Sequence, residues 1–137
     1  MARYNKDGFA YDQLLADNIT LANVGNVDTT NIGTLNSTKG GNLRLVVVAG
    51  STGVTVPSGK TMTITPIVGT TSTPATNLPA VVLTQGTTSN VTFAAGDVIT
   101  EIVLSRWTIG TNKFVKVNIA SSGDQSAQKA SVYLLAD

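Results

Sequence analysis

Apolar and polar residues alternate with a period of two from about residue 17 to the end of the chain. Such alternation is typical of β-strands, because successive side chains of a strand point to opposite faces. Helical spacing appears only weakly, and only near the N-terminus. The pattern predicts strands over residues 18–22, 29–35, 43–49, 60–68, 80–84, 90–93, 97–106, 113–120 and 128–135.

Turn-forming residues fill the gaps between these strands. Each gap contains glycine, asparagine, aspartate, serine or proline, which are the residues that tight turns favour. Residues 68–79 are rich in threonine and hold two prolines, so we expect a surface loop there. A chain of 137 residues fits one domain. Short strands at this spacing predict an all-β, antiparallel two-sheet jelly roll or β-sandwich.

Three of the predicted strands, including 128–135, carry apolar residues on both faces. A sandwich buries only one face of each sheet, so the second face of such a strand needs another partner. We predict a contact with another subunit or a neighbouring protein; the alternative is a long loop that covers these strands. The residues expected at this interface are Val46 and Val48 in the strand over 43–49, and Ile99 and Val103, which lie opposite the even-numbered inward positions of the strand over 97–106.

The N-terminal segment, residues 1–17, holds two of the three tyrosines of the chain among charged residues. It is predicted to be an arm that precedes a sandwich domain over residues 18–137. Such a terminus either frays or becomes ordered on contact with a neighbour, and the aromatic residues favour the second alternative. The arm residues expected to contact neighbouring subunits are Tyr4, Phe9, Tyr11, Leu14 and Leu15.

Composition and charge exclude several classes of function. Nine basic and eight acidic residues leave a net charge of +1, and the basic residues are dispersed, which argues against binding to nucleic acid or to an anionic membrane. Histidine and cysteine are both absent, so imidazole bases, thiolate nucleophiles and the usual nitrogen and sulfur metal ligands are absent too. We therefore expect no enzymatic activity, no cofactor and no dedicated metal site.

Three local features resemble parts of known catalytic or binding sites. Residues 53–61 approach a P-loop, but the glycine spacing is one residue too long and a strand pattern follows, so we expect a hairpin loop. Asp97 and Glu101 share a strand face, yet their α-carbons would lie roughly 13 Å apart, too far for a typical catalytic carboxylate pair. Trp107 follows the same strand; a core plug is the simpler prediction, and an aromatic platform for a sugar is the alternative.

The strand pattern resembles the small jelly-roll cement, or decoration, proteins of tailed-bacteriophage capsids. The similarity extends over roughly residues 17–137 and depends on strand pattern rather than on a diagnostic motif. At the start of the domain it lies in Asn-Ile-Thr at 18–20, Thr-Asn-Ile-Gly-Thr-Leu at 30–35 and Leu-Arg-Leu-Val-Val-Val at 43–48. At the end it lies in Ala-Ala-Gly-Asp-Val at 94–98, Phe-Val-Lys-Val-Asn at 114–118, Ser-Gly at 122–123 and Ala-Ser-Val-Tyr-Leu-Leu at 130–135.

This resemblance implies a structural virion protein, made in the cytoplasm of a bacterial host, that forms a homotrimer on the capsid exterior. It would bridge major capsid protein subunits and stabilise the expanded shell. Residues 1–16 match no pattern of the family. The chief alternative is a carbohydrate- or receptor-binding β-sandwich module of a phage tail or cell surface, because sandwiches also host such sites.

Overall fold

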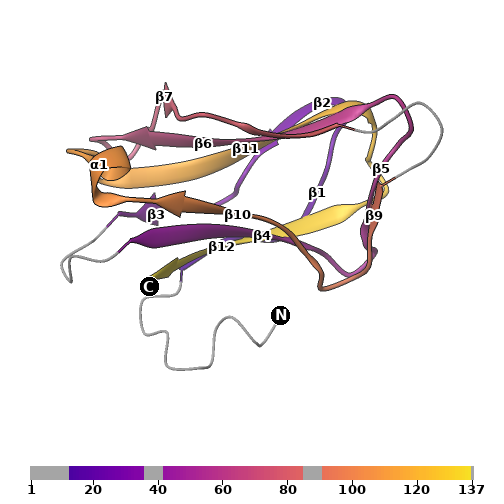
Figure 1. The fold of residues 1–137 in the computed structure, drawn as a ribbon, viewed down its shortest axis with the longest axis horizontal. Helices are drawn as coiled ribbons and strands as arrows, with labels where there is room; N and C mark the ends of the chain where they lie inside the picture. Colours follow the sequence, from indigo (N-terminus) through magenta and orange to yellow (C-terminus); the bar gives the residue numbers. More distant parts are fainter. Residues whose placement is uncertain (1–12, 36–41, 85–90, 137) are drawn as a thin grey trace.

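The computed structural model describes residues 13–35, 42–84 and 91–136, which form antiparallel β-sheets and one short helix, α1 (Arg106–Ile109) (Figure 1). The all-β prediction is therefore confirmed. The strands are β1 (Gln13–Thr20), β2 (Asn23–Asp28), β3 (Gly33–Thr34), β4 (Leu43–Ala49), β5 (Val54–Val56), β6 (Thr61–Gly69), β7 (Thr76–Asn77), β8 (Val81–Thr84), β9 (Val91–Phe93), β10 (Val98–Leu104), β11 (Phe114–Asp124) and β12 (Lys129–Ala136).

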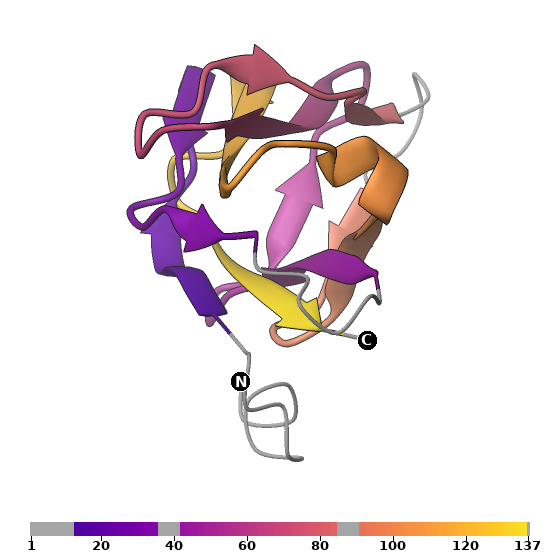
Figure 2. The ribbon, with the colours of Figure 1, turned by 90° about the vertical axis from the view of Figure 1, so that its left-hand side faces the viewer.

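Two sheets face each other across the core. One has the order β1-β12-β4-β10, and the other has the order β2-β11-β6-β7, with β3 added beside β11 and β8 beside β6. Strands β5 and β9 form a small third sheet. The chain passes repeatedly from one sheet to the other, so strands distant in sequence become neighbours, as in a jelly roll (Figures 1 and 2).

The core lies between the two large sheets. Buried and half-buried residues alternate along β6 and along the first part of β11, which is the period-two pattern that predicted these strands. Pro66 interrupts the pairing of β6 on the side away from β11: β8 pairs with β6 only as far as Ile64, and β7 pairs with β6 from Ile67 onward. Because proline has no N–H to donate, this edge of the sheet is carried by two short strands instead of one.

A buried amide joins β11 to the small third sheet. Gln125 is almost fully buried in the turn after β11. Its Oε1 accepts a hydrogen bond from the Ser121 hydroxyl at 2.6 Å, and its Nε2 donates to the Thr55 carbonyl at 2.9 Å. Buried polar groups need such partners, so this side chain fixes the position of β5 against the main sandwich.

Several predicted boundaries change in the structure. The strand β1 begins at Gln13, so the last five residues of the predicted arm belong to the sheet. The predicted strand over 29–35 is replaced by β2 and β3, because residues 29–32 form the connection between them. The P-loop-like segment is a turn closed by the Lys60 N–H and the Pro57 carbonyl, but it is not a hairpin, since β5 pairs with β9 and β6 pairs with β11.

Within the described ranges, no helix is both long enough and apolar enough to cross a bilayer.

Candidate functional site

The outer face of the four-stranded sheet carries a second hydrophobic cluster. Val46 and Val48 of β4 pack there with Tyr133 and Leu135 of β12. The prediction that these strands are apolar on both faces is therefore confirmed. All four side chains are buried within this one chain. Val46 and Val48 thus lie under cover already, and the structure corrects their assignment to an exposed subunit interface.

Ile99 was predicted to point outward, and this was wrong. Val98 pairs with Val48 while Thr100 pairs with Val47, so Ile99 is an extra residue that forms a β-bulge in β10. The bulge reverses the two faces of the strand at this point. Ile99 consequently joins the main core with 8% exposure, and Val98 packs against the outer cluster instead.

The predicted arm residues have three different locations. Tyr4, Phe9 and Tyr11 lie outside the described residues. Leu15 is fully buried in the main core, since its position in β1 points between the sheets, and so it is not a free contact residue. Leu14, its neighbour on the opposite face of β1, is 42% exposed and remains available for a contact.

Six half-buried hydrophobic residues pack against the main core, and five of them lie on or next to the strands β7 to β10; we call this part of the surface the open flank. The five are Leu78, Leu83, Val91, Phe93 and Ile102, and the sixth, Val27, lies on β2. Three exposed residues extend it: Val82 on β8, Val103 on the edge strand β10, which is exposed by 53% as predicted, and Trp107 on α1. In Figure 2, β10 and α1, both orange, lie opposite β1 and β2, both indigo.

Trp107 is held outward by the local structure of α1. The helix begins after Ser105, whose hydroxyl accepts the Thr108 N–H at 3.1 Å, and it ends before Gly110, which has a positive φ of 55°. Ile109 takes the buried position of this single turn, and Trp107 points away from it with 95% exposure. The expected core plug is therefore wrong, and the sole tryptophan is a surface residue.

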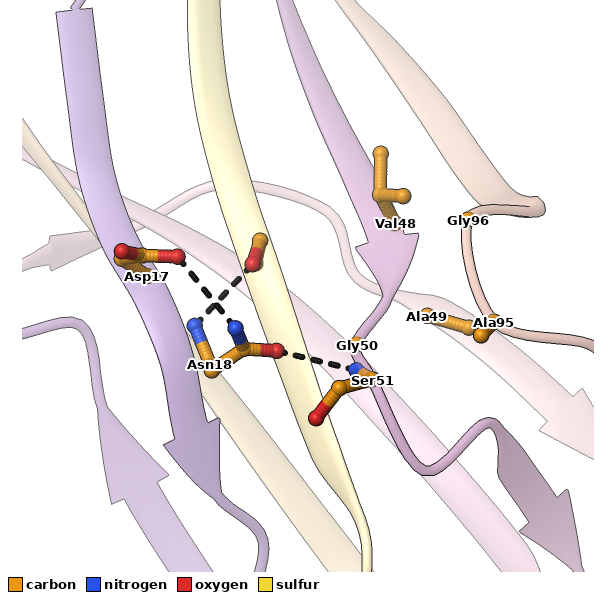
Figure 3. A pocket seen from close by; sticks show the side chains of 9 residues that line it. Asp17, Asn18, Val48, Ala49, Gly50, Ser51, Ala95 and Gly96 are labelled. Atoms are coloured by element: carbon orange, nitrogen blue, oxygen red, sulfur yellow. Dashed lines mark hydrogen bonds between the residues drawn. The ribbon is translucent and has the colours of Figure 1, made fainter. Parts of the chain in front are cut away.

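A cleft lies at one end of the outer sheet face, with a volume of about 280 Å³ (Figure 3). Its walls come from β1, β12, the end of β4 and the turn before β10. The lining residues are Asp17, Asn18, Val48, Ala49, Gly50, Ser51, Ala95, Gly96 and Ser131. The cleft is thus assembled from four separate parts of the chain.

Asn18 holds the polar side of this cleft together. It lies at an irregularity in the pairing of β1 with β12 and adopts a left-handed conformation with φ of 52°, which asparagine tolerates better than most residues. Its N–H donates to the Ser131 hydroxyl at 3.0 Å, and its Oδ1 accepts the Ser51 N–H at 3.0 Å. These two bonds tie the end of β4 to β1 across β12.

The two candidate catalytic carboxylates, Asp97 and Glu101, have structural roles. Asp97 Oδ2 accepts the N–H of Ala94 within its own turn at 2.9 Å, and Glu101 forms an ion pair with Arg44 at 3.0 Å. Lys116 of β11 forms an ion pair with Asp28 of β2 at 3.0 Å. Nowhere in the described part of the chain do three or more acidic residues gather closely enough to hold a metal ion.

No protein-family model and no curated protein sequence matches this chain. Among solved structures, a chain of "Structure of infectious bursal disease virus Gx strain" is similar, with 17% sequence identity and a TM-score of 0.44. The similarity covers 92% of this chain and 30% of that chain, so this chain spans less than a third of the viral protein's length. Similarity at this TM-score assigns neither a family nor a function.

Proposed function

We propose that this protein is a structural component of a bacteriophage virion that decorates the capsid exterior and cements neighbouring major capsid protein subunits, acting as a homotrimer without enzymatic activity. The observation that carries the proposal is the open flank, which presents half-buried core residues, Val103 and a fully exposed tryptophan on one side of the molecule. Large exposed apolar surfaces on a small protein mark sites of protein contact.

The fold narrows the choice of function. Jelly rolls recur in viral capsid proteins, lectins and cupins. The absence of histidine, the commonest metal ligand, disfavours a metal-dependent cupin activity. A capsid contact and a sugar contact remain, and the strand pattern resembles phage cement proteins rather than a lectin.

The physical basis of cementing is linkage. A protein that binds the assembled, expanded shell and not its separate parts stabilises the shell by its binding free energy. This function requires a stable body and an apolar contact surface, and it requires no reactive group. Tryptophan is among the residues that contribute most to protein interfaces, so we expect Trp107 to contribute strongly to binding.

The test combines light scattering with co-sedimentation on shells of the phage that encodes the chain. We expect a trimer that sediments with expanded shells and not with immature shells. A Trp107→Ser variant should lose most of the binding, or the trimer, while Ile32→Ser, which removes an exposed apolar side chain from the connection between β2 and β3, should lose neither. A strict monomer that ignores expanded shells would contradict the proposal.

The second candidate function is carbohydrate binding, and the exposure of Trp107 favours it specifically. An exposed indole ring is a common surface on which a sugar stacks, with polar neighbours to orient it. Reproducible hits on a glycan array that disappear in Trp107→Ser, without binding to shells, would establish this alternative and replace the cement proposal.

A further inference from the structure

The cleft between β1, β4 and the turn before β10 is a candidate binding site separate from the open flank. Asp17 is the one charged residue among those that line it. Within the described part of the chain, no basic side chain forms an ion pair with Asp17. Its nearest polar contact is the Asn18 amide at 3.5 Å, a weak hydrogen bond. The cleft therefore has one uncompensated negative charge.

The other lining groups complement a cation on an aliphatic stem. Ala95 is exposed and provides apolar surface, Val48 and Ala49 form a buried floor, and the hydroxyls of Ser51 and Ser131 add oxygens to the lining. Lysine and arginine side chains bury their methylene groups on apolar surface and keep the charged end next to acceptors. A volume of about 280 Å³ is sufficient for one such side chain but not for a large ligand.

The walls of the cleft are held in place before any ligand arrives. Asn18 of β1 forms hydrogen bonds with Ser51 and Ser131. The Gly50 N–H donates to the Lys129 carbonyl at 2.8 Å, and the Gly96 N–H donates to the Ala49 carbonyl at 2.9 Å. Since these bonds link all four parts of the wall, little conformational entropy is lost on binding. The chain as a whole carries a charge of +1, so attraction of a cation here is local.

We propose that this cleft receives a basic side chain, lysine or arginine, of a partner protein, with Asp17 as the counter-ion. The ammonium or guanidinium group donates to the Asp17 carboxylate, and the methylene stem lies on the exposed Ala95 side of the cleft. The site makes the molecule selective for a partner surface that presents a basic residue. This selectivity does not depend on what the open flank contacts.

The test uses NMR titration of the ¹⁵N-labelled full chain with N-acetyl-lysine methylamide and, separately, N-acetyl-arginine methylamide. Because the amides of Asn18, Gly50, Ser51 and Gly96 surround the cleft, we expect their signals to shift with at least one probe. The larger shift identifies which of the two side chains the site takes. N-acetyl-norleucine methylamide, which has the stem without the charge, should leave these signals unchanged.

Two variants make the result specific. Asp17→Asn should abolish the shifts while the rest of the spectrum keeps its dispersion, and Asp124→Asn, which removes an equal charge from the exposed end of β11, should preserve them. Equal shifts with norleucine, unchanged shifts in Asp17→Asn, or no shift with either cation would overturn the proposal. None of these outcomes depends on binding to a capsid, so the cement proposal stands or fails separately.

Discussion

Gly50 is the position at which a single methyl group should destabilise the protein most clearly. A Cβ placed on Gly50 would lie 2.8 Å from the carbonyl oxygen of Lys129 and against Oδ1 of Asn18. The carbonyl cannot move away freely, because it accepts the hydrogen bond from the Gly50 N–H itself at 2.8 Å. The substitution Gly50→Ala must therefore displace backbone and also disturb the bond from Ser51 to Asn18.

The expected loss follows from these two effects. Overpacking of a buried position costs roughly 1 to 3 kcal/mol, and a lost hydrogen bond costs about 1 kcal/mol more. We expect Gly50→Ala to lower the free energy of unfolding by about 2 to 4 kcal/mol. For a chain of this length each kcal/mol corresponds to about 3 to 4 °C in Tm, so the melting temperature should fall by roughly 6 to 16 °C.

The measurement is thermal and urea unfolding followed by circular dichroism, at equal protein concentrations. Gly25→Ala is the matched control, because a Cβ at Gly25 would meet nothing closer than the Ala22 side chain at 3.7 Å. We expect its stability to remain within about 0.5 kcal/mol of the parent chain. If Gly50→Ala melts at the same temperature as Gly25→Ala, the close approach of β12 to the end of β4 is not as rigid as we infer.

Three further predictions concern stability. Leu15→Ala should lower the free energy of unfolding by about 2 to 5 kcal/mol, because Leu15 is a core residue. Leu14→Ala should lower it by under about 0.5 kcal/mol. Equal losses in urea unfolding would contradict the different burial of the two side chains. Gln125→Leu should lower the free energy of unfolding by about 1 to 3 kcal/mol, because the buried Ser121 hydroxyl and the half-buried Thr55 carbonyl lose their hydrogen bonds to Gln125, and an unchanged unfolding midpoint would contradict this. The hydrogen bond from Asn118 lowers the pKa of Asp28 against the opposing effect of partial burial, and Lys116 lowers it further. Such a carboxylate stabilises the fold only while it is ionised, so Asp28→Asn should cost at most about 1 kcal/mol at neutral pH, and the difference should vanish as the pH falls through the pKa of Asp28 in the folded chain; a difference that persists in strong acid would exclude this cause.

The period-two pattern was sufficient to predict the fold class and the faces of the most regular strands. In β4 each side chain points where the alternation places it, and the limits Leu43 and Ala49 are those predicted. The same reasoning failed at Ile99, because a bulge depends on how β10 pairs with β4 and leaves no mark in the sequence of β10 alone. Trp107 was misplaced for a related reason: hydrophobic character favours burial, but the single turn of α1 gives the buried position to Ile109.

The cleft could not be predicted from any local motif. Asn18 bonds to Ser51, 33 residues away, and to Ser131, 113 residues away, so its wall exists only after the sheet has formed. One signal was present in the sequence. In β1 the apolar pair Leu15-Ala16 is followed by the polar pair Asp17-Asn18, which breaks the period of two, and such a break inside a strand is compatible with a bulge.

The pairing of β1 with β12 makes the first described strand depend on the last. During synthesis on the ribosome, β1 emerges long before its partner β12 has been translated. Its apolar side chains must stay solvated, or be shielded by a chaperone, until β12 has left the ribosome. The sandwich should therefore reach its native state only after β12 has emerged, and a nascent chain that stalls before β12 should remain sensitive to protease.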